Sequence, residues 1–410
     1  MTGTSTTTRE GEAQPSTRRF GNVSALSGLR GLAVVAVLYH HLPTGDGPRA
    51  YGALGVCAFF ALSGFLITAL LMREWDATGH VRTSEFYRRR VVRLLPGLVA
   101  FLPLVLIWAA WRGYDETRQA LFTTLWMSNW ARINDEPMGV LAHTWTLAIE
   151  AQFYVVAALL FLAAVRGRFA RHPWVVPAAL ATLVAIWRAS LWLFAGDLVR
   201  WADGGLLIYV TRSTDTRLDA ILFGVVVAFV YTRTRLVVPG WVAAAAFAVL
   251  VAMGAMDPEG DAMITVGMAA AAVCAAVIIL HLVTADSPLK HALSARPLVY
   301  LGLISYGLYL WHLPVYKLLY SQFDMAPWSL VAGGAIALSL ALASLSYHLV
   351  EQPFLGHRRR PSDATGPVDG GARATQTAAT GPIATCPATH SSDGPARYPG
   401  PAVGCHGRFE

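Results

Sequence analysis

The chain has 410 residues, of which 55% are hydrophobic and only 14% are charged. An ordinary soluble protein has about 25% charged residues, so this composition excludes a soluble globular protein and indicates an α-helical protein that crosses a membrane several times. The net charge is +7, and because the basic residues gather in loops between apolar runs, we interpret the charge as a mark of topology and not of nucleic-acid binding.

Residues 1–23 are polar and rich in Thr, Ser and Arg. This segment has no apolar stretch of the kind found in a signal peptide, and no convincing cleavage site precedes Ser24. We therefore expect a cytoplasmic N-terminal tail, followed by a first span that acts as an uncleaved anchor.

Ten apolar runs are long enough to be candidate membrane-spanning helices. They lie at residues 24–42, 52–72, 92–111, 145–165, 174–195, 218–232, 238–256, 262–284, 298–319 and 328–350. We expect an all-α, polytopic membrane domain of about ten transmembrane helices over residues 24–356.

The connecting loops predict the orientation of these spans. Most basic residues fall in every second connection, at residues 9–19, 73–93, 166–171, 233–235, 290–296 and 358–360. The other connections carry fewer: Arg49, Arg112, Arg118, Arg132, Arg200, Arg212 and Arg217. Because cytoplasmic loops are enriched in Lys and Arg, we place the first set and both termini in the cytoplasm. The acidic stretch 257–261 then lies outside, and the alternation favours ten spans over nine or eleven.

Residues 357–410 differ from the rest of the chain because they are rich in Gly and Pro, a composition typical of disorder. We expect a cytoplasmic tail there and assign it no function. The four cysteines have no spacing that indicates a metal site or a disulfide framework, so we expect neither. No internal repeat is evident, which weakens the interpretation of the chain as a transporter.

The first span carries ionisable residues, which are costly in hydrocarbon and often functional. Arg30 and His41 are eleven residues apart, so on a helix they lie within about 20° of one another and about 16 Å apart along the axis. His40 is further off this stripe. His41 is therefore a candidate general base. The alternative is a helix whose Arg reaches one membrane interface and whose His contacts the other.

Other polar residues fall in the predicted outer half of the domain. Glu150 either charge-balances His41 or pairs with an Arg structurally. Asp215, Arg217 and Asp219 either bind a polar acceptor or form a salt-bridged start of a helix. His312 is either part of the same site or a satisfied buried group.

A basic cluster lies at the predicted inner face. Arg90 and Arg93 share one helix face, and their guanidinium groups are well shaped to bind phosphates. The alternative is that both serve only to anchor this end of the helix in the cytoplasm.

The chain resembles the acyltransferase-3 family of integral membrane O-acyltransferases from about Ser24 to Gly356. The resemblance is carried by the order and spacing of LRGLA at 29–33, FALSGFLIT at 60–68, FYRRRVVRLLP at 86–96, HTWTLAIEAQFY at 143–154, DTRLD at 215–219, ISYGLYLWHLP at 304–314 and VEQPF at 350–354. It implies a ten-span bundle in a bacterial plasma membrane that moves an acyl group, often acetyl, from acyl-CoA to a hydroxyl.

The resemblance also implies roles for particular residues. Arg30 and His41 match the essential Arg and His of the family, and Arg90 with Arg93 matches its paired-Arg motif. We expect His41 to deprotonate the acceptor hydroxyl, with Glu150 steadying the imidazolium, and acyl-CoA to be a substrate and not a permanently bound cofactor. Many members have an Asp where this chain has Cys57, and some carry a hydrolase-like C-terminal domain that we do not expect here.

The expected acceptor is a cell-envelope carbohydrate or glycolipid. Three alternatives remain open at this level: acylation of a macrolide or another secondary metabolite, a transporter whose buried charges relay protons, and a structural or signalling membrane protein.

Overall fold

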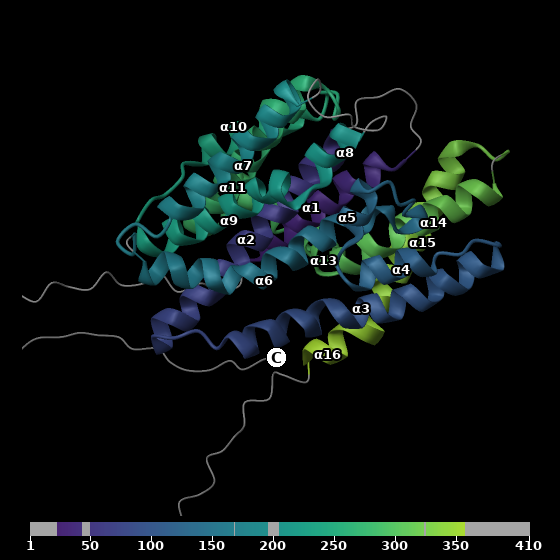
Figure 1. Cartoon of the computed structure of the whole chain (residues 1–410), viewed down its shortest axis with the longest axis horizontal. Coiled ribbons are helices and arrows are strands. Elements are labelled where there is room, and N and C mark those ends of the chain that lie inside the picture. Colours follow the sequence, from purple (N-terminus) through teal and green to yellow (C-terminus); the bar gives the residue numbers. More distant parts are fainter. Residues whose placement is uncertain (1–22, 43–49, 168, 196–204, 324, 357–410) are drawn as a thin grey trace, which may run out of the picture. The chain divides into compact units, whose positions relative to one another are not determined.

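The computed structural model describes residues 23–42, 50–167, 169–195, 205–323 and 325–356. The tails predicted at residues 1–23 and 357–410 therefore lie outside the described residues, apart from Val23, and so do Cys386 and Cys405. Within the described ranges the chain is helical and contains no β-strand, which confirms the all-α prediction (Figure 1).

The α-helices are α1 (Ser24–His40), α2 (Tyr51–Thr78), α3 (Thr83–Trp111), α4 (Thr117–Thr124), α5 (Ser128–Ile133), α6 (Trp145–Arg166), α7 (Val175–Phe194), α8 (Gly205–Arg212), α9 (Thr214–Arg233), α10 (Gly240–Met253), α11 (Met268–Thr284), α12 (Pro288–Leu293), α13 (Arg296–Leu303), α14 (Ser305–Gln322), α15 (Trp328–Ser346) and α16 (Gln352–Gly356). A 3₁₀ segment, η1 (Gly139–Thr144), leads into α6, and two π-helical segments, η2 (Met263–Gly267) and η3 (Tyr347–Glu351), adjoin α11 and α15.

Six helices of the described residues are long and apolar enough to cross a membrane. A seventh is added if the bent pair α13 and α14 is one span. The chain is therefore a multi-pass helical membrane protein. The three other predicted spans fall on α1, α9 and α10, of which α1 and α10 are only 17 and 14 residues long. The count of ten and the cytoplasmic position of both termini stay predictions.

Helix α2 lies at the centre of the bundle, where 78% of its apolar window is buried. It packs along α9, as Figure 1 shows, and this contact depends on small residues. A Cβ added at Gly64 would lie 1.9 Å from the Ile221 carbonyl oxygen, and one at Gly224 would lie 2.0 Å from that of Ala61. Glycine at both positions lets the two backbones approach closely, as small residues do in membrane helix pairs.

The ninth predicted span is broken. Helices α13 and α14 meet at an angle of 74° near Ser305, a residue that is only 1% exposed. Irregular backbone at membrane depth is tolerated where it is buried in protein or lines a cavity. The break near Ser305 is therefore of the kind that is tolerated because protein surrounds it.

Candidate active site

His41 follows α1 directly and keeps a helical backbone, with φ −90° and ψ −3°. Its ring Nδ1 lies 2.9 Å from the Val37 carbonyl oxygen, which accepts only if Nδ1 carries the proton. The other nitrogen, Nε2, is then unprotonated and can accept a proton. The local helical geometry thus selects the tautomer that a general base requires.

The His41 ring belongs to a row of four imidazole rings. The His41 ring packs edge-on against His40 at 5.0 Å and against His312 at 4.9 Å, and His312 packs against His143 at 5.1 Å. His312 is fixed by its Nδ1, 2.6 Å from the Tyr309 carbonyl oxygen. His312 and His143 are 0% and 3% exposed. The sequence-predicted His312 is therefore brought to His41.

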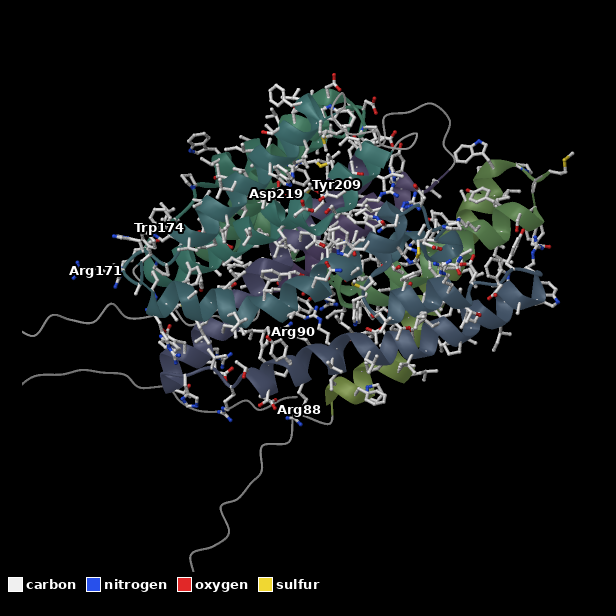
Figure 2. All side chains as sticks on the ribbon, viewed as in Figure 1. Arg88, Arg90, Arg171, Trp174, Tyr209 and Asp219 are labelled. Carbon is white, nitrogen blue, oxygen red and sulfur yellow. The ribbon has the colours of Figure 1, made fainter. Side chains whose placement is uncertain are left out.

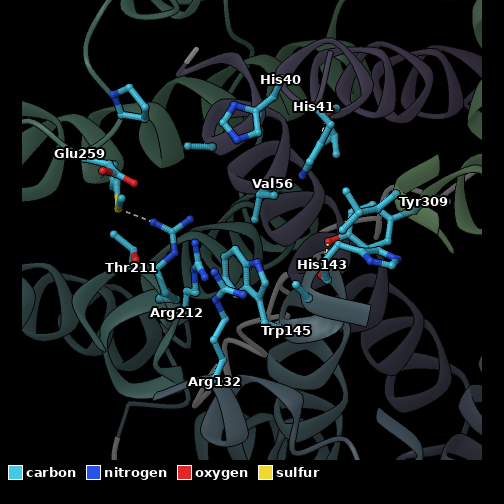
Figure 3. Close-up of a pocket in the computed structure, with 18 residues that line it drawn as sticks. His40, His41, Val56, Arg132, His143, Trp145, Thr211, Arg212, Glu259 and Tyr309 are labelled. Atoms are coloured by element: carbon cyan, nitrogen blue, oxygen red, sulfur yellow. Dashed lines mark hydrogen bonds between the residues drawn. The ribbon is translucent and has the colours of Figure 1, made fainter. Parts of the chain in front are cut away.

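A cavity of about 220 Å³, here called the His41 cavity, lies next to these rings. Its lining comes from eight parts of the chain: the end of α1, the start of α2, α5, η1 with α6, α8 with α9, the 258–259 loop, the start of α11, and α14. Figure 3 shows His40 and His41 on its upper side, and Arg132, Arg212 and Trp145 on the opposite side. A hydroxyl-bearing molecule in this cavity has direct access to His41.

Glu150 lines a second, smaller cavity of about 40 Å³, the Glu150 cavity, together with Arg30 and Ser305. Glu150 accepts hydrogen bonds from Ser63 and Tyr154, and Arg30 lies 3.5 Å from Ser305 Oγ through its Nη2. The expected contact between Glu150 and His41 is therefore not formed. The reason is depth, because Glu150 lies further along α6 and shares a cavity with Arg30 instead.

The third cavity, of about 290 Å³, is the Arg93 cavity. Arg30 and Arg93 line it together with Glu351, which belongs to the π-helical segment η3. Arg90 is 7% exposed, and its guanidinium lies 5.6 Å from the centre of the Tyr154 ring. Figure 2 shows Arg90 on the side of α3 that faces the bundle, and Arg88 on the opposite side.

These three cavities adjoin one another. The His41 and Glu150 cavities share Val56 and Tyr309, and the Glu150 and Arg93 cavities share Arg30 and Tyr306. The chain thus has a row of internal spaces with the His41 imidazole at one end, the Arg93 guanidinium at the other and Arg30 between them. This arrangement suits a long substrate with an anionic end and a reactive end.

The predicted acceptor residues of α9 separate in the structure. Arg217 lines the His41 cavity. Asp219 instead forms a 2.7 Å ion pair with Arg188, and both side chains are buried. Asp215 accepts hydrogen bonds from Ser213, Trp187 and Tyr209 at the start of α9. Neither Asp lines any of the three cavities.

Sequence reasoning missed several residues of the His41 cavity. Arg132 and Arg212 come from the short helices α5 and α8. From the sequence, both residues are expected in loops between the predicted spans. One signal was available: both are basic residues on the side of the membrane that the charge bias predicts to be poor in them. Tyr309 was visible only as part of a motif, yet it lies where two cavities meet.

Within the described ranges, no group of three or more His, Cys, Asp or Glu side chains is arranged to hold a metal ion.

Comparisons with known proteins identify relatives of the chain. O-acetyltransferase OatA of Staphylococcus aureus (strain NCTC 8325) is 29% identical over 353 residues, which is 80% of this chain and 56% of that protein. A protein of S. aureus strain COL with a provisional O-acetyltransferase name is 28% identical over 361 residues, 81% of this chain and 57% of its own length. The chain thus spans a little over half the length of these relatives. No solved structure matches it.

The model of one family, described as an acyltransferase domain (Acyl_transf_3), matches residues 23–348. This range contains the described helices from α1 to the start of η3 and all three cavities except for the side chain of Glu351. The chain belongs to the acyltransferase-3 family.

Proposed function

We propose that the chain is an O-acyltransferase of a bacterial plasma membrane that moves an acyl group, in the first instance acetyl, from acyl-CoA to a hydroxyl of a cell-envelope carbohydrate or glycolipid. The row of three adjoining cavities between Arg93 and His41 is the observation that carries this proposal. The O-acetyltransferase names of the bacterial relatives support the reaction and the acetyl group.

The donor occupies the row of cavities from the Arg93 end. Arg90 and Arg93 have no carboxylate within 4 Å among the described residues, so their guanidinium groups are free to bind the phosphates of CoA. The pantetheine arm then runs past Arg30 through the Glu150 cavity. This path brings the thioester toward His41.

The reaction is completed in the His41 cavity. His41 Nε2 takes the proton of the acceptor hydroxyl while the oxygen attacks the thioester carbonyl. The carbon–sulfur bond breaks, an ester forms, and the proton passes from His41 to the departing CoA thiolate. Glu150 is assigned to the second cavity, where its charge offsets that of Arg30.

The test is acetyl transfer in membranes that contain the full chain, supplied with radiolabelled acetyl-CoA. Alkali-labile label is measured in the carbohydrate and glycolipid fractions. We expect His41→Ala to lose about 100-fold or more of the rate, since general-base catalysis contributes about 10² to 10⁴-fold. Arg118→Gln is the control, because Arg118 is an exposed residue paired with Glu136 and lines none of the cavities.

Two outcomes contradict the proposal. One is a His41→Ala protein that transfers acetyl within twofold of the unchanged chain. The other is label that appears only on an added macrolide and not in the envelope fractions, which would retain the reaction and replace the acceptor.

A further inference from the structure

Arg217 is a buried cation that forms no ion pair with a carboxylate of the described residues. Its side chain is 2% exposed, and its two terminal nitrogens donate to the sulfurs of Met268 and Cys57, the second at 3.6 Å. Its Nε has no hydrogen-bond partner. Sulfur is a weak acceptor, whereas a buried guanidinium normally requires an anion. Nearby Arg188 has such an anion in Asp219, whereas Arg217, which lines the His41 cavity, has none in the described part of the chain.

Two more arginines line the same cavity. No carboxylate lies within 4 Å of Arg132 or Arg212 in the described part of the chain, and Arg132 Nε is buried without a partner. Figure 3 shows both side chains reaching into the cavity beside Trp145. The acidic residue among the lining side chains is Glu259, which is exposed. Counting the described residues, the lining of the His41 cavity therefore carries three guanidinium groups and one exposed carboxylate.

The backbone that carries these arginines is held in place. Asn129 of α5 is 0% exposed and donates to Thr214 Oγ1 at 3.0 Å and to the Arg212 carbonyl oxygen at 3.4 Å. Gln152 of α6 donates to Asn129 Oδ1 at 3.0 Å and accepts from Thr214. This network joins α5, α6 and the α8–α9 junction. Hydrogen bonds thus hold the helices that carry the three arginines in fixed positions, as a preorganised binding site requires.

We propose that the His41 cavity is built for an acceptor that carries a carboxylate or phosphate group beside the hydroxyl to be acylated, with Arg132, Arg212 and Arg217 binding that anion. This inference rests on the proposed function, because it specifies the acceptor of that same site. Guanidinium forks match the planar oxygens of both anions. The anion binds on the arginine side of the cavity, and the hydroxyl then faces His41 on the other side (Figure 3).

The donor does not account for these arginines. Among the described residues, Arg90 and Arg93 have no carboxylate within 4 Å, and Arg93 lines the cavity at the opposite end of the row. A donor whose phosphates bind at that end leaves the charge of the His41 cavity uncompensated. The acceptor is the remaining molecule that enters this cavity in the reaction.

The first experiment compares three small probes on the purified full chain in detergent: methyl glucoside, methyl glucuronide and glucose 6-phosphate. Each is titrated at constant ionic strength while the unfolding temperature is followed, since a ligand of the folded state raises it in a saturable way. We expect a charged probe to bind at least about tenfold more tightly than the uncharged glucoside. The stronger of the two charged probes identifies the anion as carboxylate or phosphate.

Variants at and beside the three arginines give the matched test. Cys57→Asp places a carboxylate beside Arg217 and is expected to weaken charged-probe binding about tenfold or more, while Cys57→Ser, which adds no charge, leaves it within about twofold. Arg212→Gln should weaken it by a similar factor and Arg118→Gln should not. Binding of acetyl-CoA should stay within about twofold in all four variants.

Three results overturn the proposal. The glucoside binds as tightly as the charged probes, or neither charged probe binds, or Cys57→Asp and Cys57→Ser behave alike. Failure of the acyltransferase function has a different signature, namely no acetyl-CoA binding and no acetyl transfer. If a charged probe binds but the chain transfers no acetyl, the anion-binding site is supported and the proposed reaction is rejected.

Discussion

Four arginines of one basic stretch on α3 differ in what they contact. Arg88 lies 2.6 Å from Glu85, and Arg89 lies 3.0 Å from Glu74. Arg90 is only 7% exposed and Arg93 lines the Arg93 cavity, and neither has a carboxylate within 4 Å among the described residues. Arg88 and Arg89 are therefore engaged in ion pairs at the protein surface, whereas Arg90 and Arg93 are available to bind a ligand.

This difference predicts the behaviour of matched variants. Arg90→Gln or Arg93→Gln removes a charge that we assign to the CoA phosphates, and the KM for acetyl-CoA should rise about tenfold or more. Arg88→Gln removes an exposed charge whose ion pair is worth little, so its KM should stay within about twofold. Initial rates over a range of acetyl-CoA concentrations provide the measurement. Equal KM values for Arg88→Gln and Arg93→Gln would contradict the assignment.

The sequence predicts individual residues where one helix dictates their positions. Arg30 and His41 follow from helical spacing alone, and both line the row of cavities. Glu150 accepts from Ser63 and lines a cavity with Arg30 instead of contacting His41, because the depth at which residues of two different helices meet depends on their packing and not on either sequence alone. Arg132 and Arg212 meet only through the packing of α5 on α8, which no local pattern encodes.

At the scale of helices, the apolar runs predict where the chain is helical but not how the helices break or meet. All ten predicted spans fall on helices. The bend near Ser305 has no Pro or Gly at the break itself, since Gly302 and Gly307 lie on either side, and it follows from the packing around it. The short helices α4, α5 and α8 lie in stretches too polar or too short for a hydropathy signal.

The crossing of α2 and α9 yields a prediction about stability. In Gly224→Ala the new Cβ would lie 2.0 Å from the Ala61 carbonyl oxygen and 2.8 Å from the Phe65 backbone nitrogen. The two helices must move apart, at a cost of about 1–3 kcal/mol. Thermal unfolding of the purified chain in detergent should therefore show a lower transition temperature.

Gly333→Ala on α15 is the matched control, because a Cβ there meets no atom within 4 Å. Alanine is favoured over glycine inside a helix by about 0.5–1 kcal/mol, so this variant should unfold at the same or a slightly higher temperature. A Gly224→Ala protein as stable as Gly333→Ala would show that the close approach of α2 and α9 is not required.

At the scale of the molecule, the two ends of the helices have different chemistry. One end joins Asp76 to Arg233 at 3.2 Å and places Arg166 over Trp75 at 5.0 Å. The other end gathers the lining of the His41 cavity, including Pro258 and Glu259. Each end collects loops from one of the two alternating sets that the charge pattern defines. The described loops are therefore consistent with a single orientation of the bundle, and the positive-inside rule predicts which end is cytoplasmic.

That orientation is tested by labelling single cysteines in a chain whose native cysteines are replaced by serine. Asp257 and Arg171 are exposed and lie at the two different ends, next to the His41 cavity and between α6 and α7, where Figure 2 labels Arg171. In intact cells, a membrane-impermeant maleimide should label Asp257→Cys and leave Arg171→Cys unlabelled until the cells are permeabilised. A free cysteine on a cytoplasmic protein serves as the control for intact membranes. The reverse pattern would place His41 on the cytoplasmic side, so that the acceptor would be acylated inside the cell before it reaches the envelope.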